Sequence, residues 1–347
     1  MNPPDVYRPE PLLETDTPWV DSFTPPEQAA ALLLEGEPLL ITDRYQTGAE
    51  ILDWLAALMP APPPQAPFAA RRAHAAALRK ASLRLLAPIV GHRPKLEGFA
   101  EIGFLAELYP ELKTFYLPFL VLQELRGAWV RYVEGEKLSV LGVRLHPFFG
   151  VYMPTRAEHL ELFGTWLSRY PGLKQNAVDV GTGCGVLALM LARAGFSEVL
   201  AVDINPNAVE SLNRELSRRP APVTASVGDL LADVPGPLEL IVFNPPWIPG
   251  TVETPFDAAL RYSSGLFERF FEQAVTRMAP QGRLVMIFSN VSELLRPDVA
   301  HPIEMELSRG RLRLVDKLHR KIKSADRRRR TRERVEVWEL ALVGDDG

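Results

Sequence analysis

The chain has 347 residues, of which 47% are hydrophobic and 24% charged, and its formal net charge is −4. This composition excludes an intrinsically disordered chain, and the length allows two domains that each bury a core. The single cysteine, Cys184, excludes an internal disulfide and a multi-cysteine metal site, so we expect a reducing compartment and no metal. Met1–Asp5 has no basic start, and no stretch of about 18 apolar residues occurs. We therefore expect a cytoplasmic protein without a membrane span, a monomer or weak oligomer.

Residues 1–136 predict a mostly helical domain. Thr24 is a candidate N-cap, Glu27 follows at the capping-box spacing, and Gly36 marks the end of this first helix. Further helices are expected at 50–58, 69–87, 99–108 and 118–134. Five prolines within residues 60–67 predict an extended linker, since so many prolines suit neither helix nor strand.

Residues 137–153 predict a hairpin that links this domain to the next, with 137–145 as one strand and 148–153 as the other. Residues 154–347 then alternate apolar strands with helical patterns, as an α/β fold with a doubly wound parallel sheet requires. After a first strand that ends at residue 180, strands are expected at 198–202, 223–227, 240–243, 282–288, 311–318 and 334–342. A last crossover helix is expected within 293–308.

A glycine-rich turn follows the first of these strands and precedes a helical pattern. Its glycines, Gly181, Gly183 and Gly185, allow backbone N–H groups to approach a ligand closely. A dinucleotide fingerprint would place its third glycine one residue later, where Val186 stands, so the pattern argues against NAD. Asp203 closes the second strand, where an acid would reach ribose hydroxyls. The pattern favours a ribose-containing cofactor, and the alternative is a bare strand-to-helix turn.

The second motif is the apolar strand 240–243 followed by Asn244-Pro245-Pro246-Trp247. With the glycine loop before it, the chain from about Phe149 to Leu342 resembles a class I S-adenosylmethionine-dependent methyltransferase. The resemblance is to the group whose fourth strand ends in Asp, Asn or Ser, two prolines and an aromatic residue, a group that methylates planar nitrogens. The segment 150–158 is similar to its counterpart in the release-factor protein-glutamine methyltransferases and in the small-domain rRNA methyltransferases.

The resemblance implies a Rossmann-like sheet of seven strands with helices on both faces, closed by an antiparallel pair, and S-adenosylmethionine as the cofactor. It also implies that the helical first domain recognises the substrate. The cofactor-binding residues are then expected among Asp179, Gly181, Thr182, Gly183, Gly185, Asp203, Ile204, Asp229 and Asn244. Trp247 departs from the family pattern, because the glutamine enzymes usually carry a tyrosine there.

The chemistry of the tetrapeptide suits a planar nitrogen, whose delocalised lone pair makes it a poor nucleophile. The Asn244 side-chain oxygen and the Pro245 carbonyl can each accept one N–H and so orient that lone pair toward a methyl group. Two successive prolines, Pro245 and Pro246, hold these acceptors rigidly. Trp247 is expected to stack on the planar substrate. The alternative is a proline-stiffened turn with an aromatic anchor.

The segment 309–334 carries 13 Lys and Arg against 3 Asp and Glu. Its densest part, Arg327–Arg330, lies within 319–334, which we expect to be a loop between the last two strands. These arginines can contact RNA phosphates, or the loop can simply be solvated. The helical domain favours a protein substrate of the release-factor kind, and the arginine loop favours RNA. Two other functions stay open, a catalytically silent cofactor-binding module and a nicotinamide dehydrogenase, but the second leaves the tetrapeptide unexplained.

Overall fold

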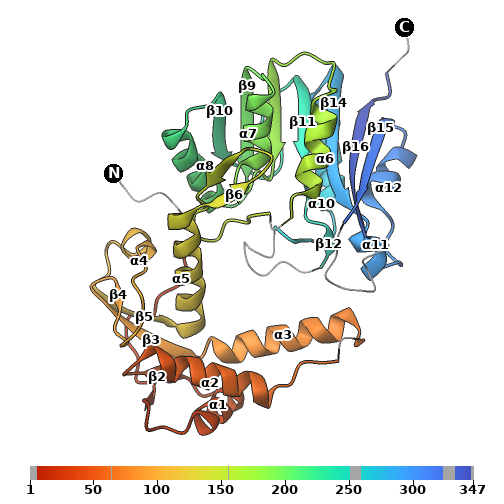
Figure 1. Cartoon of the computed structure of the whole chain (residues 1–347). Coiled ribbons are helices and arrows are strands. Elements are labelled where there is room, and N and C mark those ends of the chain that lie inside the picture. The colour runs from red at the N-terminus through yellow and green to blue at the C-terminus, as the bar shows by residue number, and fades with distance from the viewer. Residues whose placement is uncertain (1–5, 64, 155, 251–258, 323–332, 345–347) are drawn as a thin grey trace. The chain divides into compact units, whose positions relative to one another are not determined.

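The structure is a computed structural model, and it describes residues 6–63, 65–154, 156–250, 259–322 and 333–344 (Figure 1). The chain divides into two compact units, Met1–Val133 and Glu134–Gly347. Across the described ranges, no helix has both the length and the apolar character that a membrane crossing needs.

The first unit combines helices with a small sheet. Its helices are α1 (Pro26–Glu35), α2 (Tyr45–Leu58), α3 (Phe68–Ser82), α4 (Phe104–Leu108) and α5 (Phe119–Glu134), which reaches the boundary between the units. Its strands are β1 (Trp19–Val20), β2 (Leu39–Ile41), β3 (Leu85–Val90), β4 (Arg93–Pro94) and β5 (Thr114–Pro118). They pair in the order β1-β2-β3-β4, and β5 also pairs with β3.

Helices supply most of the regular secondary structure described in this unit, but its sheet was not predicted from the sequence. The helix α1 ends at Gly36 as predicted, whereas its N-cap is Pro25, not Thr24. The helix expected at 69–87 stops at Ser82, and β3 then runs through Pro88. Most of β3 is buried, which suits a strand covered by neighbours on both sides better than the end of an exposed helix. The helix expected at 99–108 is confined to α4.

The second unit opens with a hairpin that is shorter than expected. Strand β6 (Glu136–Leu138) pairs with β7 (Val143–Leu145), so the segment 137–145, expected to form one strand, contains all of β7 and all but the first residue of β6. Gly142 takes a φ of +62°, and its N–H donates to the Leu138 carbonyl at 2.8 Å. Because glycine adopts positive φ without a Cβ penalty, the chain reverses here. Pairing with 148–153 was therefore a wrong prediction.

A seven-stranded sheet forms the centre of the second unit, as predicted. Its strands are β8 (Asn176–Val180), β9 (Glu198–Asp203), β10 (Val223–Val227), β11 (Leu238–Phe243), β14 (Met278–Ser289), β15 (Leu312–Lys321) and β16 (Arg334–Leu342). Their order is β10-β9-β8-β11-β14-β16-β15. The first five in that order run parallel, and β16 is antiparallel to both of its neighbours. The parallel strands therefore end at one common edge.

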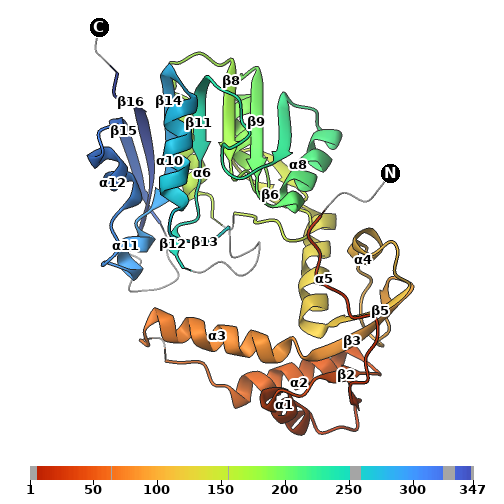
Figure 2. The same cartoon turned by 180° about the vertical axis from the view of Figure 1, so that it is seen from behind.

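Helices cover both faces of this sheet (Figures 1 and 2). One core contains residues of α6 (Glu158–Leu167), α7 (Val186–Arg193) and α8 (Pro206–Arg218), and the other contains residues of α10 (Leu266–Arg277) and α12 (Pro302–Ser308). The crossover helix expected within 293–308 is instead split into α11 (Val291–Leu295) and α12. Pro297 and Pro302 account for the break, because proline cannot continue a helical hydrogen-bond ladder. A short pair, β12 (Ile248–Pro249) and β13 (Arg261–Tyr262), follows β11.

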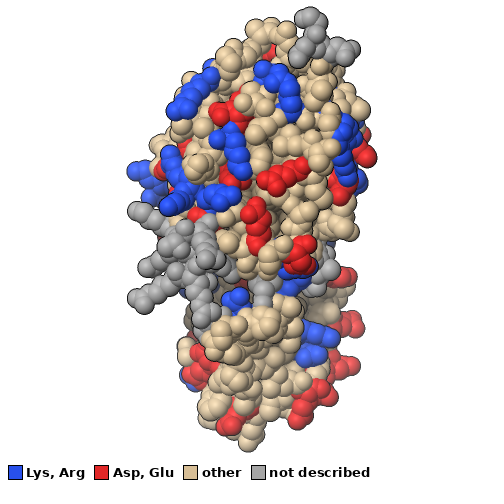
Figure 3. Space-filling model, turned by 90° about the vertical axis from the view of Figure 1, so that its right-hand side faces the viewer, with Lys and Arg blue, Asp and Glu red and all other residues tan. Residues whose placement is uncertain are grey.

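Basic side chains gather among acidic ones on the side of the second unit seen in Figure 3.

The segment 319–334, expected to be a loop, belongs in part to strands, because β15 extends to Lys321 and β16 begins at Arg334. Arg327–Arg330 lie outside the described residues. Several cations of this segment lie in ion pairs, namely Arg309 and Arg311 with Glu306, Lys317 and Arg334 with Glu336, and Arg320 with Glu161.

Candidate active site

The glycine loop between β8 and α7 is held by its own backbone N–H groups. Gly181 and Thr182 both donate to the Val202 carbonyl, at 2.7 and 3.1 Å, and Gly183 donates to Asp203 Oδ2 at 2.8 Å. These three N–H groups therefore already have acceptors within the protein, and the expected approach of the loop backbone to a ligand stays a prediction. A pyrophosphate is normally bound by free N–H groups at such a turn. The loop thus suits a cofactor without phosphates.

Gly185 is required by both its backbone conformation and its packing. Its φ is +81°, and its N–H donates to the Thr182 carbonyl at 2.8 Å. A Cβ at this position would lie 2.5 Å from Leu212 Cδ1 on α8. The close approach of α8 therefore leaves no room for a side chain where α7 begins.

Asp179 is fully buried beneath the loop, with 0% of its surface exposed. Its Oδ2 accepts hydrogen bonds from Thr182 Oγ1 at 2.7 Å and from the Ala188 N–H at 3.0 Å. Its Oδ1 has no hydrogen-bond partner among the described residues. Burial raises the pKa of the Asp179 carboxyl to about 7. This side chain ties the loop to the first turns of α7 and retains one free acceptor.

Asp203 ends β9 beside the loop, as its expected role requires. Its two oxygens accept the N–H groups of Gly183 and Asn205 at 2.8 and 2.9 Å. A carboxylate offers about four acceptor sites, so these two bonds leave capacity for hydroxyl donors. Burial raises the pKa of the Asp203 carboxyl. Ile204 follows with 62% of its surface exposed, which gives the end of β9 an apolar surface suited to a planar ring.

Asp229 follows β10, but its side chain is engaged. It forms an ion pair with Arg269 of α10, and both side chains are about half exposed. No local pattern predicts this pairing, because Arg269 lies 40 residues away in the chain. A contact between Asp229 and a ligand would have to share its carboxylate with Arg269.

Asn244 stands at the end of β11, next to the glycine loop. In the parallel pairing of β11 with β8, Phe243 is the partner of Val180, so Asn244 is level with Gly181. Asn244 Oδ1 is buried and accepts no hydrogen bond within the described part of the chain. A buried acceptor without a donor costs about 1–3 kcal/mol, which a ligand N–H at this position would recover.

Trp247 is fixed more firmly than its expected stacking role suggests. Its indole Nε1 donates to the Ile287 carbonyl at 3.3 Å, and its partly buried ring packs against both cores of the second unit. His159 of α6 meets this ring nearly perpendicularly, at 88° with 5.6 Å between the ring centroids. Sequence reasoning missed His159, although it directly follows the segment 150–158 that carried the family resemblance.

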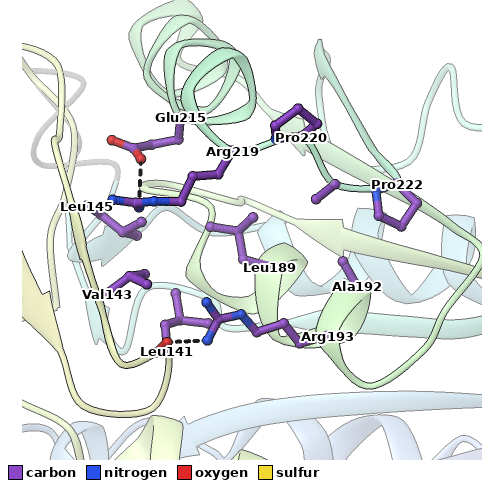
Figure 4. A pocket seen from close by; sticks show the side chains of 11 residues that line it. Leu141, Val143, Leu145, Leu189, Ala192, Arg193, Glu215, Arg219, Pro220 and Pro222 are labelled. Carbon is purple, nitrogen blue, oxygen red and sulfur yellow. Dashed lines mark hydrogen bonds and ion pairs between the residues drawn. The ribbon is translucent and has the colours of Figure 1, made fainter.

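A cavity of about 280 Å³ lies elsewhere in the second unit (Figure 4). The hairpin contributes Leu141 and Val143 to its wall, and the carboxyl ends of α7 and α8 contribute Arg193 and Glu215. None of the expected site residues lines it. We therefore place the candidate site at the ends of β8, β9 and β11, not in this cavity.

Replacing Gly185 with alanine is expected to lower the free energy of unfolding by about 2–4 kcal/mol. About 1–2 kcal/mol comes from the left-handed backbone and the rest from overpacking against Leu212. Gly265 is the matched control, since it has a similar φ of +87° but nothing within 4 Å of an added Cβ. Urea denaturation of both variants measures the difference. Equal losses for Gly185→Ala and Gly265→Ala would contradict a steric role for Leu212.

Burial of Asp179 also predicts a pH dependence of stability. Its native pKa of about 7 lies above the ordinary value of 3.8, so the folded state binds a proton more tightly than the unfolded state. The group's contribution should weaken as pH rises from about 4 to about 7, by at most about 1.4 kcal/mol per pH unit, and then level off. Asp179→Asn keeps an acceptor for Thr182 without titrating. Denaturation at several pH values across this range should therefore show that the free energy of unfolding of the variant rises relative to that of the wild type. A difference that does not change with pH would refute the raised pKa of Asp179.

Residues 161–294 match the family model described as "Methyltransferase small domain". A provisionally named protein N5-glutamine methyltransferase of Methanocaldococcus jannaschii is 28% identical over 132 residues, which are 38% of this chain and 61% of the relative. The release factor glutamine methyltransferase of Deinococcus radiodurans is 37% identical over 94 residues, 27% of this chain and 34% of the relative.

Among solved structures, the ribosomal protein L11 methylase of Lactobacillus delbrueckii subsp. bulgaricus is 20% identical, with a TM-score of 0.41 over 58% of this chain and 84% of that one. Of the two glutamine methyltransferases, the chain spans 61% and 34% of the full length, which is less than two thirds in both cases. The family match covers the glycine loop and the Asn-Pro-Pro-Trp segment described above. Residues 161–294 of the second unit are therefore similar to methyltransferases of the small-domain family.

Proposed function

We propose that this protein is an enzyme that methylates a planar nitrogen, and that the side-chain amide of a protein glutamine is its leading acceptor. The observation that carries the proposal is the buried Asn244 Oδ1, which is level with the glycine loop and has no donor among the described residues. The names of two relatives, a protein glutamine and a release factor glutamine methyltransferase, support this choice of acceptor.

S-adenosylmethionine fits the residues around the loop. When bound, it supplies an electrophilic methyl group on a sulfonium. It has no phosphates, in agreement with a loop whose N–H groups already have protein partners. The residues proposed to hold it are Asp179, Gly181, Thr182, Gly183, Gly185, Asp203, Ile204 and Asp229, with Asn244 at the border to the acceptor. Asp203 would bind ribose hydroxyls through its remaining lone pairs, and Ile204 would cover one face of the adenine.

The acceptor side of the site is proposed to work by orientation. An amide nitrogen has little nucleophilicity because its lone pair is delocalised into the carbonyl. Asn244 Oδ1 and the Pro245 carbonyl would accept the two N–H groups and hold the nitrogen with its lone pair facing the methyl group. Pro246 stiffens the turn, and Trp247 forms a wall for the planar group. No strong general base is needed in this arrangement.

Two other functions fit the site less well. A dehydrogenase would need the loop N–H groups for its dinucleotide, and Gly181, Thr182 and Gly183 have already donated theirs. A silent cofactor-binding module would have no need of an unpartnered buried acceptor beside the loop, and it predicts cofactor binding without turnover.

One experiment separates protein from RNA as the methyl acceptor. The enzyme and radiolabelled cofactor are incubated with a lysate of cells that lack this protein, before and after nuclease treatment. Label that survives the nuclease indicates a protein acceptor.

Asn244→Ala is expected to reduce turnover by about 10² to 10³, the usual loss for one preorganised hydrogen-bond partner, while cofactor affinity stays nearly unchanged. Because Oδ1 accepts no hydrogen bond from the described residues, the melting temperature should fall little. Asn176 provides the matched control: its Oδ1 accepts the Glu239 N–H at 2.9 Å, so Asn176→Ala should melt earlier and stay active. A folded Asn244→Ala protein that methylates at the wild-type rate would disprove the proposed role.

RNA base amines are the second candidate acceptors, favoured by the excess of 13 basic over 3 acidic residues in 309–334. Five of these 13 cations are paired with carboxylates in the described part of the chain, so Arg327–Arg330 would supply half of the remaining eight charges. Replacing all four with serine should weaken RNA binding and flatten its salt dependence by up to about 0.9 log units per lost phosphate contact. Binding titrations across a range of salt concentrations measure this slope. Methylation of a protein acceptor should be unaffected.

A further inference from the structure

His159 is a buried histidine whose ring contacts Trp247. Only 4% of its surface is exposed, and its Nε2 has no hydrogen-bond partner among the described atoms. Burial lowers the pKa of the His159 imidazole to about 4, so the ring is neutral near pH 7. A buried polar nitrogen without a partner destabilises the fold relative to an apolar side chain. The ring must therefore be explained by something other than hydrogen bonding within the core.

Two contacts of different kinds fix the Trp247 ring. The hydrogen bond from Nε1 to the Ile287 carbonyl holds one edge of the indole to β14, and the ring also packs against both cores of the second unit. The perpendicular contact with His159, at 5.6 Å between the ring centroids, adds an aromatic contact that depends on the tilt of the indole. Edge-to-face ring pairs favour such a geometry because the positive edge of one ring meets the negative face of the other. Together with the core packing, the two contacts hold the plane of the indole.

We propose that His159 is a positioning residue, which sets the plane of Trp247 and thereby the wall against which the planar methyl acceptor lies. The inference rests on the proposed function for its consequence, but the contact itself is independent of any substrate. His159 is not proposed to touch the acceptor or to move a proton. Its effect should therefore appear in acceptor binding and not in the transfer step.

The first experiment observes the indole directly. The full chain is labelled with 5-fluorotryptophan, and Trp247→Phe assigns the Trp247 fluorine resonance. His159→Leu, which removes the ring, should shift or broaden that resonance, whereas His159→Phe, which keeps an aromatic edge, should leave it close to the wild-type position. Phe163→Leu is the matched control on the same helix, because Phe163 stacks on Trp166 at 5.8 Å and should perturb the Trp166 resonance instead.

The second experiment measures methylation of a full-length release factor with labelled S-adenosylmethionine. His159→Leu should raise KM for the release factor about two- to tenfold, the range of an aromatic pair, with kcat and cofactor affinity nearly unchanged. His159→Phe should restore KM. An unmoved Trp247 resonance in His159→Leu, or equal defects in the leucine and phenylalanine variants, would overturn the proposal. If the wild type does not methylate the release factor, the proposed acceptor fails, and the resonance still decides whether His159 positions Trp247.

Discussion

The site depends on the buried carboxylate of Asp179. Through one oxygen it holds the Thr182 hydroxyl and the Ala188 N–H, which belong to the glycine loop and to α7. A strand, a turn and a helix are thereby fixed to one another within a few ångströms. Keeping a carboxylate out of water is costly, and its raised pKa reflects that cost. The geometry of the loop is thus maintained at the expense of global stability, as is common where a binding site is built into a core.

The register of the parallel strands brings the remaining parts together. Since β11 pairs with β8, the last residues of these strands, Phe243 and Val180, lie side by side although more than 60 positions separate them in the chain. Trp247 packs against the cores on both faces and is tied to β14 through its indole nitrogen. The helix α6 reaches the same ring through His159. A change in the packing on either face of the sheet is therefore expected to move Trp247 and so to alter the acceptor side of the site.

The sequence was informative where a short motif determines local geometry. The positions of Gly185 and Asn244 followed from the order of strand, turn and helix. The seven strands of the second unit and its closing antiparallel pair followed from the family resemblance. The sheet of the first unit was missed because β3 is stabilised by β2 and β5, which are distant in the chain. The alanine-rich segment that precedes β3 favours a helix locally, so the helix was predicted to continue through β3. The partners of Asp229 and Trp247 were equally invisible, since no local pattern links them to Arg269 or His159.

The glycine loop also has a consequence for the thermodynamics of binding. Its N–H groups find acceptors in Val202, Asp203 and the loop itself, so the turn is ordered without any ligand. A loop that needs no ligand to fold loses little conformational entropy when one arrives. Affinity should then be determined by the contacts themselves, and association should proceed without a slow rearrangement of this segment.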